Sequence, residues 1–334
     1  MRHFSIHFDF SPVSRLFFAP FLVILGLFAM PRPVLAQGKA DPVSTACIPS
    51  DLSALIVPEG RSVLVNEVKE LSRKGSTPDK TLSSVPASGS FDGREREQGY
   101  RIFSKEAQQG HPAAMVNLAV SSLAGWGTPP NAGAALYWLH AAADRGYAPA
   151  FYNLGILYFK GCGVRQDTAE AFHYFDLGAR AGYAAAQVNL GYFYDHGLGV
   201  AQDHGMAAFW YRQAAESGEA QAQYNLADLY LHGEGVPKDE SMAFAWFQKA
   251  ALQGHVSAQI MTGSMLAAGR GASQNLAAAY LWIFAATLQG DGRGAPQLRV
   301  LEGQLPGEEI AQAKVRAQSL LGARGAASQV ALSH

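Results

Sequence analysis

Four side chains have the types that hold metal ions or transfer protons: Asp195, His196, Asp228 and His232. Asp228 and His232 are four residues apart, so a helix would place them on one face, a single turn apart. The sequence contains no S-x-x-K, G-x-S-x-G or H-E-x-x-H motif, which removes the common routes to an acyl-enzyme or a zinc hydrolase. Whether the four side chains act together depends on the elements that carry them.

These elements belong to a repeat. A glycine returns every 36 residues, and alanines, an aromatic residue and a pair of glycines recur in the same register; the series is Gly110, Gly146, Gly182, Gly218, Gly254 and Gly290. His196 and His232 therefore occupy equivalent places in neighbouring units, about 10 Å apart, which is too far to share one ion easily. We interpret the four side chains as solvated residues of a groove, and expect no metal site and no cofactor.

One unit illustrates the predicted structure. Apolar residues at three- and four-residue spacings predict a first helix over 148–160, glycines 161 and 163 predict a loop, and a second helix is expected from Thr168 to about Arg180. A single helix pair cannot bury its apolar face, whereas stacked pairs share a core. The sequence thus predicts an all-α protein, a right-handed α-solenoid of about five 36-residue helix–loop–helix repeats with terminal capping helices.

The chain outside the repeats shows further segments. Basic residues, an apolar run and the sequence Val34-Leu35-Ala36 predict a signal peptide cleaved after Ala36, hence a periplasmic or secreted protein without a stable membrane span; retention as a membrane anchor is the alternative. The predicted domains are the signal peptide (1–36), a Ser/Pro/Gly-rich linker with one short helix (37–93), the solenoid (94–290), capping helices (291–322) and a flexible tail (323–334). The formal net charge of −1 gives no electrostatic indication of nucleic-acid binding.

Cys47 and Cys162 are the two cysteines of the chain. In an oxidising compartment they could pair and tie the N-terminal segment to the repeats, and two unpaired residues are the alternative. Because Cys162 occupies a variable loop position, we expect it to be exposed.

Three successive units carry the strings NLGILYFKGCGV, NLGYFYDHGLGV and NLADLYLHGEGV, followed in register by AFHYF, AAFWY or AFAWF. These motifs resemble the Sel-one-like repeat (SLR) family, which is related to the tetratricopeptide repeats, and the likeness covers residues 94–290. The resemblance implies a non-enzymatic scaffold that binds a protein or peptide in the cell envelope or outside the cell. An envelope hydrolase or β-lactam-binding protein of the same family is one alternative, and a glycan-recognising scaffold is another. The oligomeric state stays open.

The tetratricopeptide geometry implies that the first helix of each unit lines a concave binding face. The residues expected on this face are Tyr152, Asn153, Ile156, Phe159, Lys160, Val188, Asn189, Tyr192, Asp195, His196, Tyr224, Asn225, Asp228, Leu231 and His232. The asparagines recur at one position, where an amide can bind a peptide backbone or bond a neighbouring repeat. The aromatic residues are expected to supply affinity. An error of one residue in the helical phase would instead place half of them in the core.

Overall fold

The computed structural model describes residues 93–331, all of which belong to one unit of the chain, residues 43–334. The predicted signal peptide, most of the predicted linker, Cys47 and residues 332–334 lie outside the described residues. The described part contains helices and no strand: α3 (Gly93–Gln108), α4 (Pro112–Ala124), α5 (Ala132–Ala143), α6 (Ala148–Lys160), α7 (Thr168–Arg180), α8 (Ala184–His196), α9 (His204–Glu216), α10 (Ala220–His232), α11 (Glu240–Leu252), α12 (Val256–Ala268), α13 (Leu276–Leu288), the short 3₁₀ helix η2 (Gly292–Gly294), α14 (Ala295–Glu302) and α15 (Gly307–Ala331).

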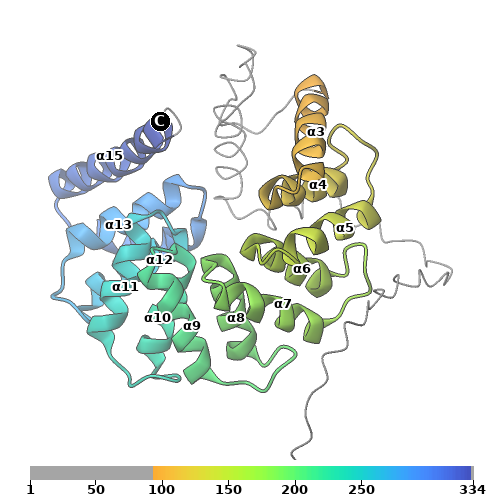
Figure 1. The fold of residues 1–334 in the computed structure, drawn as a ribbon. Coiled ribbons are helices and arrows are strands. Elements are labelled where there is room, and N and C mark those ends of the chain that lie inside the picture. The colour runs from red at the N-terminus through yellow and green to blue at the C-terminus, as the bar shows by residue number, and fades with distance from the viewer. Residues whose placement is uncertain (1–92, 332–334) are drawn as a thin grey trace, which may run out of the picture. The chain divides into compact units, whose positions relative to one another are not determined.

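Each helix from α3 to α13 packs against the next along the chain (Figure 1), and α4–α5, α6–α7, α8–α9, α10–α11 and α12–α13 form the five repeat pairs. The protein is therefore an all-α solenoid, as the sequence predicts. The helices α6 and α7 have the predicted bounds.

The two loop glycines of each unit have different roles. In unit two, Gly161 ends α6 in the left-handed conformation, with φ of 74°, and its N–H donates to the carbonyl of Leu157. In the next unit, Gly199 also has a positive φ, and a Cβ there would lie 2.7 Å from the carbonyl oxygen of Thr168 in the preceding unit. The second glycine thus permits close contact between units.

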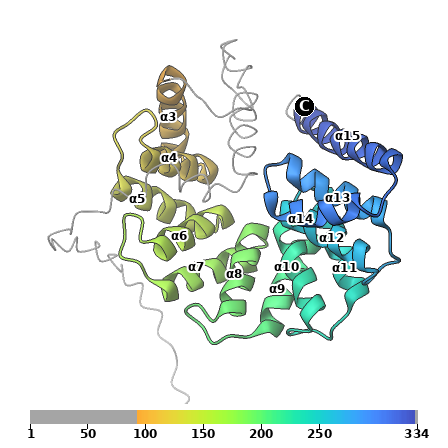
Figure 2. The ribbon, with the colours of Figure 1, turned by 180° about the vertical axis from the view of Figure 1, so that it is seen from behind.

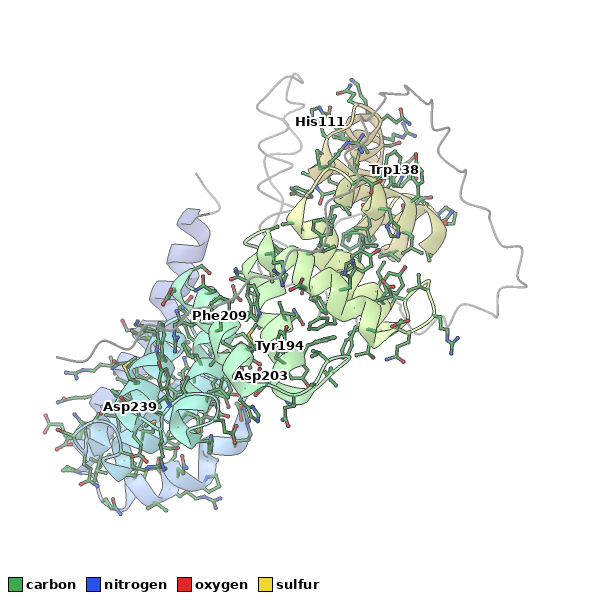
Figure 3. The ribbon with its side chains drawn as sticks, turned by 60° about the horizontal axis from the view of Figure 1, so that its bottom comes forward. His111, Trp138, Tyr194, Asp203, Phe209 and Asp239 are labelled. Atoms are coloured by element: carbon green, nitrogen blue, oxygen red, sulfur yellow. The ribbon has the colours of Figure 1, made fainter. Side chains whose placement is uncertain are left out.

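Each second helix begins at an asparagine or aspartate whose side chain accepts a hydrogen bond from the first turn, as expected for an N-cap. Figure 3 labels two of them, Asp203 before α9 and Asp239 before α11. The caps recur every 36 residues, so each unit fixes the start of its own second helix.

Small residues allow the two helices of a pair to approach closely. Ala171 and Ala207, two of the alanines that recur in the repeat register, are fully buried. At Gly191 on α8, a Cβ would lie 2.7 Å from the ring of Tyr211 on α9, and Gly155 has the same relation to Phe175. A large ring on the second helix therefore packs onto a bare stretch of backbone on the first.

A ladder of glutamines, buried at Gln223 and Gln259 and exposed at Gln253 and Gln289, joins successive units. Gln223 donates from its Nε2 to the carbonyl of Ala215, at 3.1 Å, and Gln259 bonds Ala251 in the same way. Across the joints, Gln253 Nε2 donates to Gln223 Oε1 at 2.8 Å, and Gln289 Nε2 to Gln259 Oε1 at 2.8 Å. These bonds satisfy the buried amides of Gln223 and Gln259.

The ends of the array are covered by helices. The helix α3, which begins at Gly93, packs against α4. At the other end η2, α14 and α15 pack against α13. The helix α15 continues to Ala331, whereas the sequence predicted a flexible tail from residue 323.

Cys162 differs from its prediction. It is disulfide-bonded and 2% exposed, packed in the core cluster that contains Ala135, Leu139 and Leu157. The expectation of an exposed side chain is therefore wrong, because the loop folds back onto the preceding unit. The predicted pairing with Cys47 stays a prediction, since that residue lies outside the described part.

Within residues 93–331 no helix combines the length and the apolar character that a membrane span requires.

Candidate functional site

A cavity of about 880 Å³ is lined mainly by residues of α8 and α10, the first helices of units three and four. Figure 2 shows these two helices in the fold. It is lined by eight of the side chains predicted on the binding face, Val188 among them, and by five further residues. The lining comprises Val188, Asn189, Tyr192, Asp195, His196, Gln202, His204, Tyr211, Gln221, Tyr224, Asn225, Asp228 and Glu234.

The cavity is explained by the small residue at one repeat position. Tyr152 of unit two and Tyr224 of unit four occupy the position that holds Val188 in unit three. The Tyr152 ring packs 6.0 Å from that of Phe175 and 5.5 Å from that of Tyr183, measured between ring centres. A valine is shorter than a tyrosine, so part of the space that the ring fills in unit two stays open in unit three.

Tyr211 forms the inner wall of the cavity. It stands on α9 at the position that holds Phe175 and Phe247 in the adjacent units, and it is 1% exposed. Burial raises the pKa of its phenol, the nearby Asp195 carboxylate raises it further, and a hydrogen bond with the Asn225 side chain lowers it. The phenol therefore stays neutral and holds Asn225 in place.

The asparagines are positioned by their own helices. Asn189 donates from its Nδ2 to the carbonyl of Ala185 at 2.9 Å, and Asn153 donates to Pro149 at 2.7 Å. In contrast, Asn225 accepts from Gln221 Nε2 at 2.9 Å. Asn153 and Asn189 thus bond the backbone of their own helices and not, as suggested, the backbone of a neighbouring repeat.

Tyr192 is the exposed aromatic residue of the cavity. Its ring stacks on that of His196 with 4.0 Å between ring centres, and 41% of the residue is accessible to solvent. Because His196 lies against one face of the ring, the remaining surface of Tyr192 is available to an occupant.

The charged groups of the cavity are mainly acidic. Asp195 Oδ1 lies 2.7 Å from His204 Nδ1, whereas Asp228 Oδ1 lies 3.5 Å from His232 Nδ1. Burial raises the pKa of the Asp228 carboxyl; His232 lowers it, and the carboxylates of Glu234 and Asp195 raise it. The lining includes three carboxylates and two imidazoles, but no lysine or arginine.

The predicted residues of unit two do not line this cavity. Tyr152 is 5% exposed and Ile156 is 8% exposed, so the prediction that they face an open groove is wrong for both. Phe159 is partly buried, with its ring 5.2 Å from that of Phe193 on the following first helix. Lys160 is exposed, and Leu231 in unit four is buried. The next unit covers the apolar side chains of α6, which therefore belong to the core.

The four side chains considered for metal binding or proton transfer form two separate pairs. His196 Nδ1 lies 3.7 Å from Asp195 Oδ2, while His232 pairs with Asp228 and does not line the cavity. Among the described residues, no group of three histidine, cysteine, aspartate or glutamate side chains is arranged to hold a metal ion.

The sequence analysis missed Gln202, His204, Tyr211, Gln221 and Glu234 as lining residues. Four of them lie on the loops or on α9, outside the first helices to which the prediction was limited. A tyrosine at position 211, where the neighbouring units carry phenylalanine, is a signal that could have pointed to a polar environment.

Comparison with known proteins places the repeats in a family. The Sel1 repeat matches residues 112–147, 148–183, 184–219, 220–255 and 256–291. A protective antigen of uropathogenic Escherichia coli with an SLR fold shares 31% sequence identity with this chain, and the two structures superpose with a TM-score of 0.62. The match covers 71% of this chain and 50% of the antigen. A Sel1 repeat protein from Oxalobacter formigenes shares 29% identity and a TM-score of 0.58, over 70% of this chain and 69% of that one. No curated protein matches in sequence.

Proposed function

Since this chain belongs to the Sel1 repeat family, whose members are generally protein-interaction scaffolds, we propose that the cavity between α8 and α10 binds an extended segment of a partner protein. The observation that carries the proposal is the open space at Val188, beside the exposed side chain of Tyr192. In unit two the buried ring of Tyr152 fills the equivalent position. Aromatic anchors in partly open pockets dominate the energetics of many interfaces.

The polar lining supports a peptide occupant. Asn189, Asn225, Gln202 and Gln221 carry amides that can donate to and accept from a peptide backbone regardless of its side chains. Each is already oriented by a hydrogen bond within the protein. Groups held in place in this way lose little conformational entropy when a partner binds.

The chain is proposed to act by binding rather than by catalysis, in the periplasm or outside the cell. Sel1 repeat scaffolds are typically non-enzymatic, which supports the first part. The predicted signal peptide supports the second, and the likeness to a bacterial protective antigen is compatible with it. Detection of the mature N-terminus at Gln37 in an exported fraction would test this location.

Site-specific photo-crosslinking tests the binding site. A benzoylphenylalanine at Tyr192 is expected to capture a partner, whereas the same group at Tyr137 on α5, which is 65% exposed, is not. The substitution Val188→Tyr should fill the cavity and abolish capture from position 192 while the protein stays folded. Equal capture from both positions, or capture unaffected by Val188→Tyr in a folded protein, would refute the proposed site.

A further inference from the structure

The charge of the cavity indicates which partner side chain it receives. Asp195, Asp228 and Glu234 line it, and the lining contains no lysine or arginine to neutralise them. His204 and His196 are the basic groups of the lining, and three carboxylates outnumber these two imidazoles. At neutral pH the cavity therefore has an excess of negative charge that an occupant must match.

Two of the three carboxylates, those of Asp195 and Asp228, differ in how closely a histidine approaches them. Asp195 is 19% exposed and bonded to His204, while the Asp228 side chain is 44% exposed and faces His232 at the longer distance of 3.5 Å. Burial, and then the nearby carboxylates of Glu234 and Asp195, disfavour the ionised form of Asp228. A cation placed among them would relieve this repulsion.

Two aromatic rings stand beside the same carboxylates. Tyr192 is stacked on His196 at 4.0 Å, and Tyr224 is stacked on His255 at 4.7 Å, so a histidine lies against each ring. Both tyrosines line the cavity. A cation near an aromatic face is attracted by the electron density of the ring, which adds to its attraction to carboxylates.

From this combination of tyrosine walls, carboxylates and absent basic side chains, we propose that the occupant is a peptide segment that places a lysine or arginine side chain in the cavity. The ammonium or guanidinium group lies near Asp195 and Asp228, and its aliphatic stem packs on Tyr192. This inference rests on the proposed function and specifies the chemistry of its partner.

The test uses pools of seven-residue peptides, blocked at both ends, with a fixed central residue and random flanking residues. The central residue is lysine, arginine, norleucine or glutamate in four separate pools. Each pool is passed over the immobilised mature chain and over its Val188→Tyr variant, and the retained peptides are quantified by mass spectrometry. Retention by the wild type but not by the variant defines binding in the cavity.

We expect retention of the lysine and arginine pools to exceed that of the norleucine pool by about tenfold, since hydrogen bonds to charged groups are the stronger class. The variants Asp228→Asn and Glu234→Gln should reduce this preference. The control Asp176→Asn, which removes a carboxylate paired with Arg180 on α7, should not. Glu234 is exposed, so its variant tests the charge without disturbing the core.

The outcomes separate the two proposals. Equal cavity-dependent retention of the lysine, norleucine and glutamate pools would overturn the charge inference and leave peptide binding intact. Retention of no pool above the Val188→Tyr background would overturn the proposed function itself. A preference for lysine that persists in Asp228→Asn and Glu234→Gln would also overturn the inference, because the carboxylates would not be its cause.

Discussion

Units two and three place equivalent residues in opposite environments. Ile156 on α6 is buried, whereas Tyr192, which occupies the same repeat position on α8, is 41% exposed at the cavity. Likewise Tyr152 packs into the core, while Val188 leaves space. The register of the repeat thus determines where a side chain points, and its size and polarity determine whether that direction is filled or open.

The difference is a matter of volume and polarity. In unit two, aromatic rings of successive helices contact one another, as Phe159 and Phe193 do. In unit three, the residue equivalent to Phe159 is Asp195, which bonds His204. A carboxylate favours contact with water and polar partners, so this stretch of the array does not close over its first helices.

Removing the tyrosine ring of unit two should have the largest effect. Tyr152→Ala is expected to lower the free energy of unfolding by about 3 kcal/mol, because a buried ring leaves a cavity behind. Tyr192→Ala, the matched control, should change it by less than about 1 kcal/mol, since Tyr192 is exposed. Chemical denaturation measures both. Similar losses for the two variants would contradict the contrast between units two and three.

Adding a single methyl group beneath the cavity should have the next largest effect. Gly191→Ala places a Cβ 2.7 Å from the ring of Tyr211, and overpacking of this kind costs about 1–3 kcal/mol. The control Gly133→Ala meets only the Asn131 side chain at 3.5 Å and should be neutral or stabilising, because alanine favours a helix. Thermal unfolding distinguishes them. A neutral Gly191→Ala would show that Tyr211 can move, and that the cavity wall is not rigid.

The sequence predicted the parts of this molecule that repeat. The helix bounds in unit two follow from spacing alone, and the alanines that recur in the same register are buried, because every unit packs its two helices in the same way. The cavity depends on departures from the repeat, such as Val188 in place of tyrosine, whose effect is fixed by contacts with the next unit. The resemblance to the family implied that the first helices line a binding face. It did not indicate which of their residues the following unit covers, and Tyr152 is one of the covered residues.

The joint between units four and five should respond to pH. His255 accepts from the backbone N–H of Ala258 with its Nδ1, at 3.2 Å, and thereby caps α12; Tyr183 and Glu219 at the equivalent positions make no such bond. Burial, assisted by the charge of Arg293, lowers the pKa of His255. The folded state therefore disfavours the proton that the unfolded state binds below a pKa of about 6.5.

Stability that depends on neutral His255 is present above about pH 6.5 and is lost as pH falls through the lower folded pKa. The variant His255→Asn keeps a capping acceptor without this titration, and should reduce the loss of stability between pH 7 and pH 5. Denaturation at a series of pH values measures the difference between the two proteins. Parallel pH profiles would refute the role assigned to His255.

The smallest expected effects concern the glutamine ladder, where the joints differ by one residue. Gln253 bonds Gln223 at one joint, but Ser217 occupies its position at the preceding joint, opposite Gln187. Gln253→Ala should cost about 1 kcal/mol, since it removes one hydrogen bond from a partly buried amide. Ser217→Gln should gain at most about 1 kcal/mol, because it adds the missing bond but orders a long side chain. If Ser217→Gln destabilises the protein while Gln253→Ala is neutral, the ladder follows from packing and does not itself hold the units together.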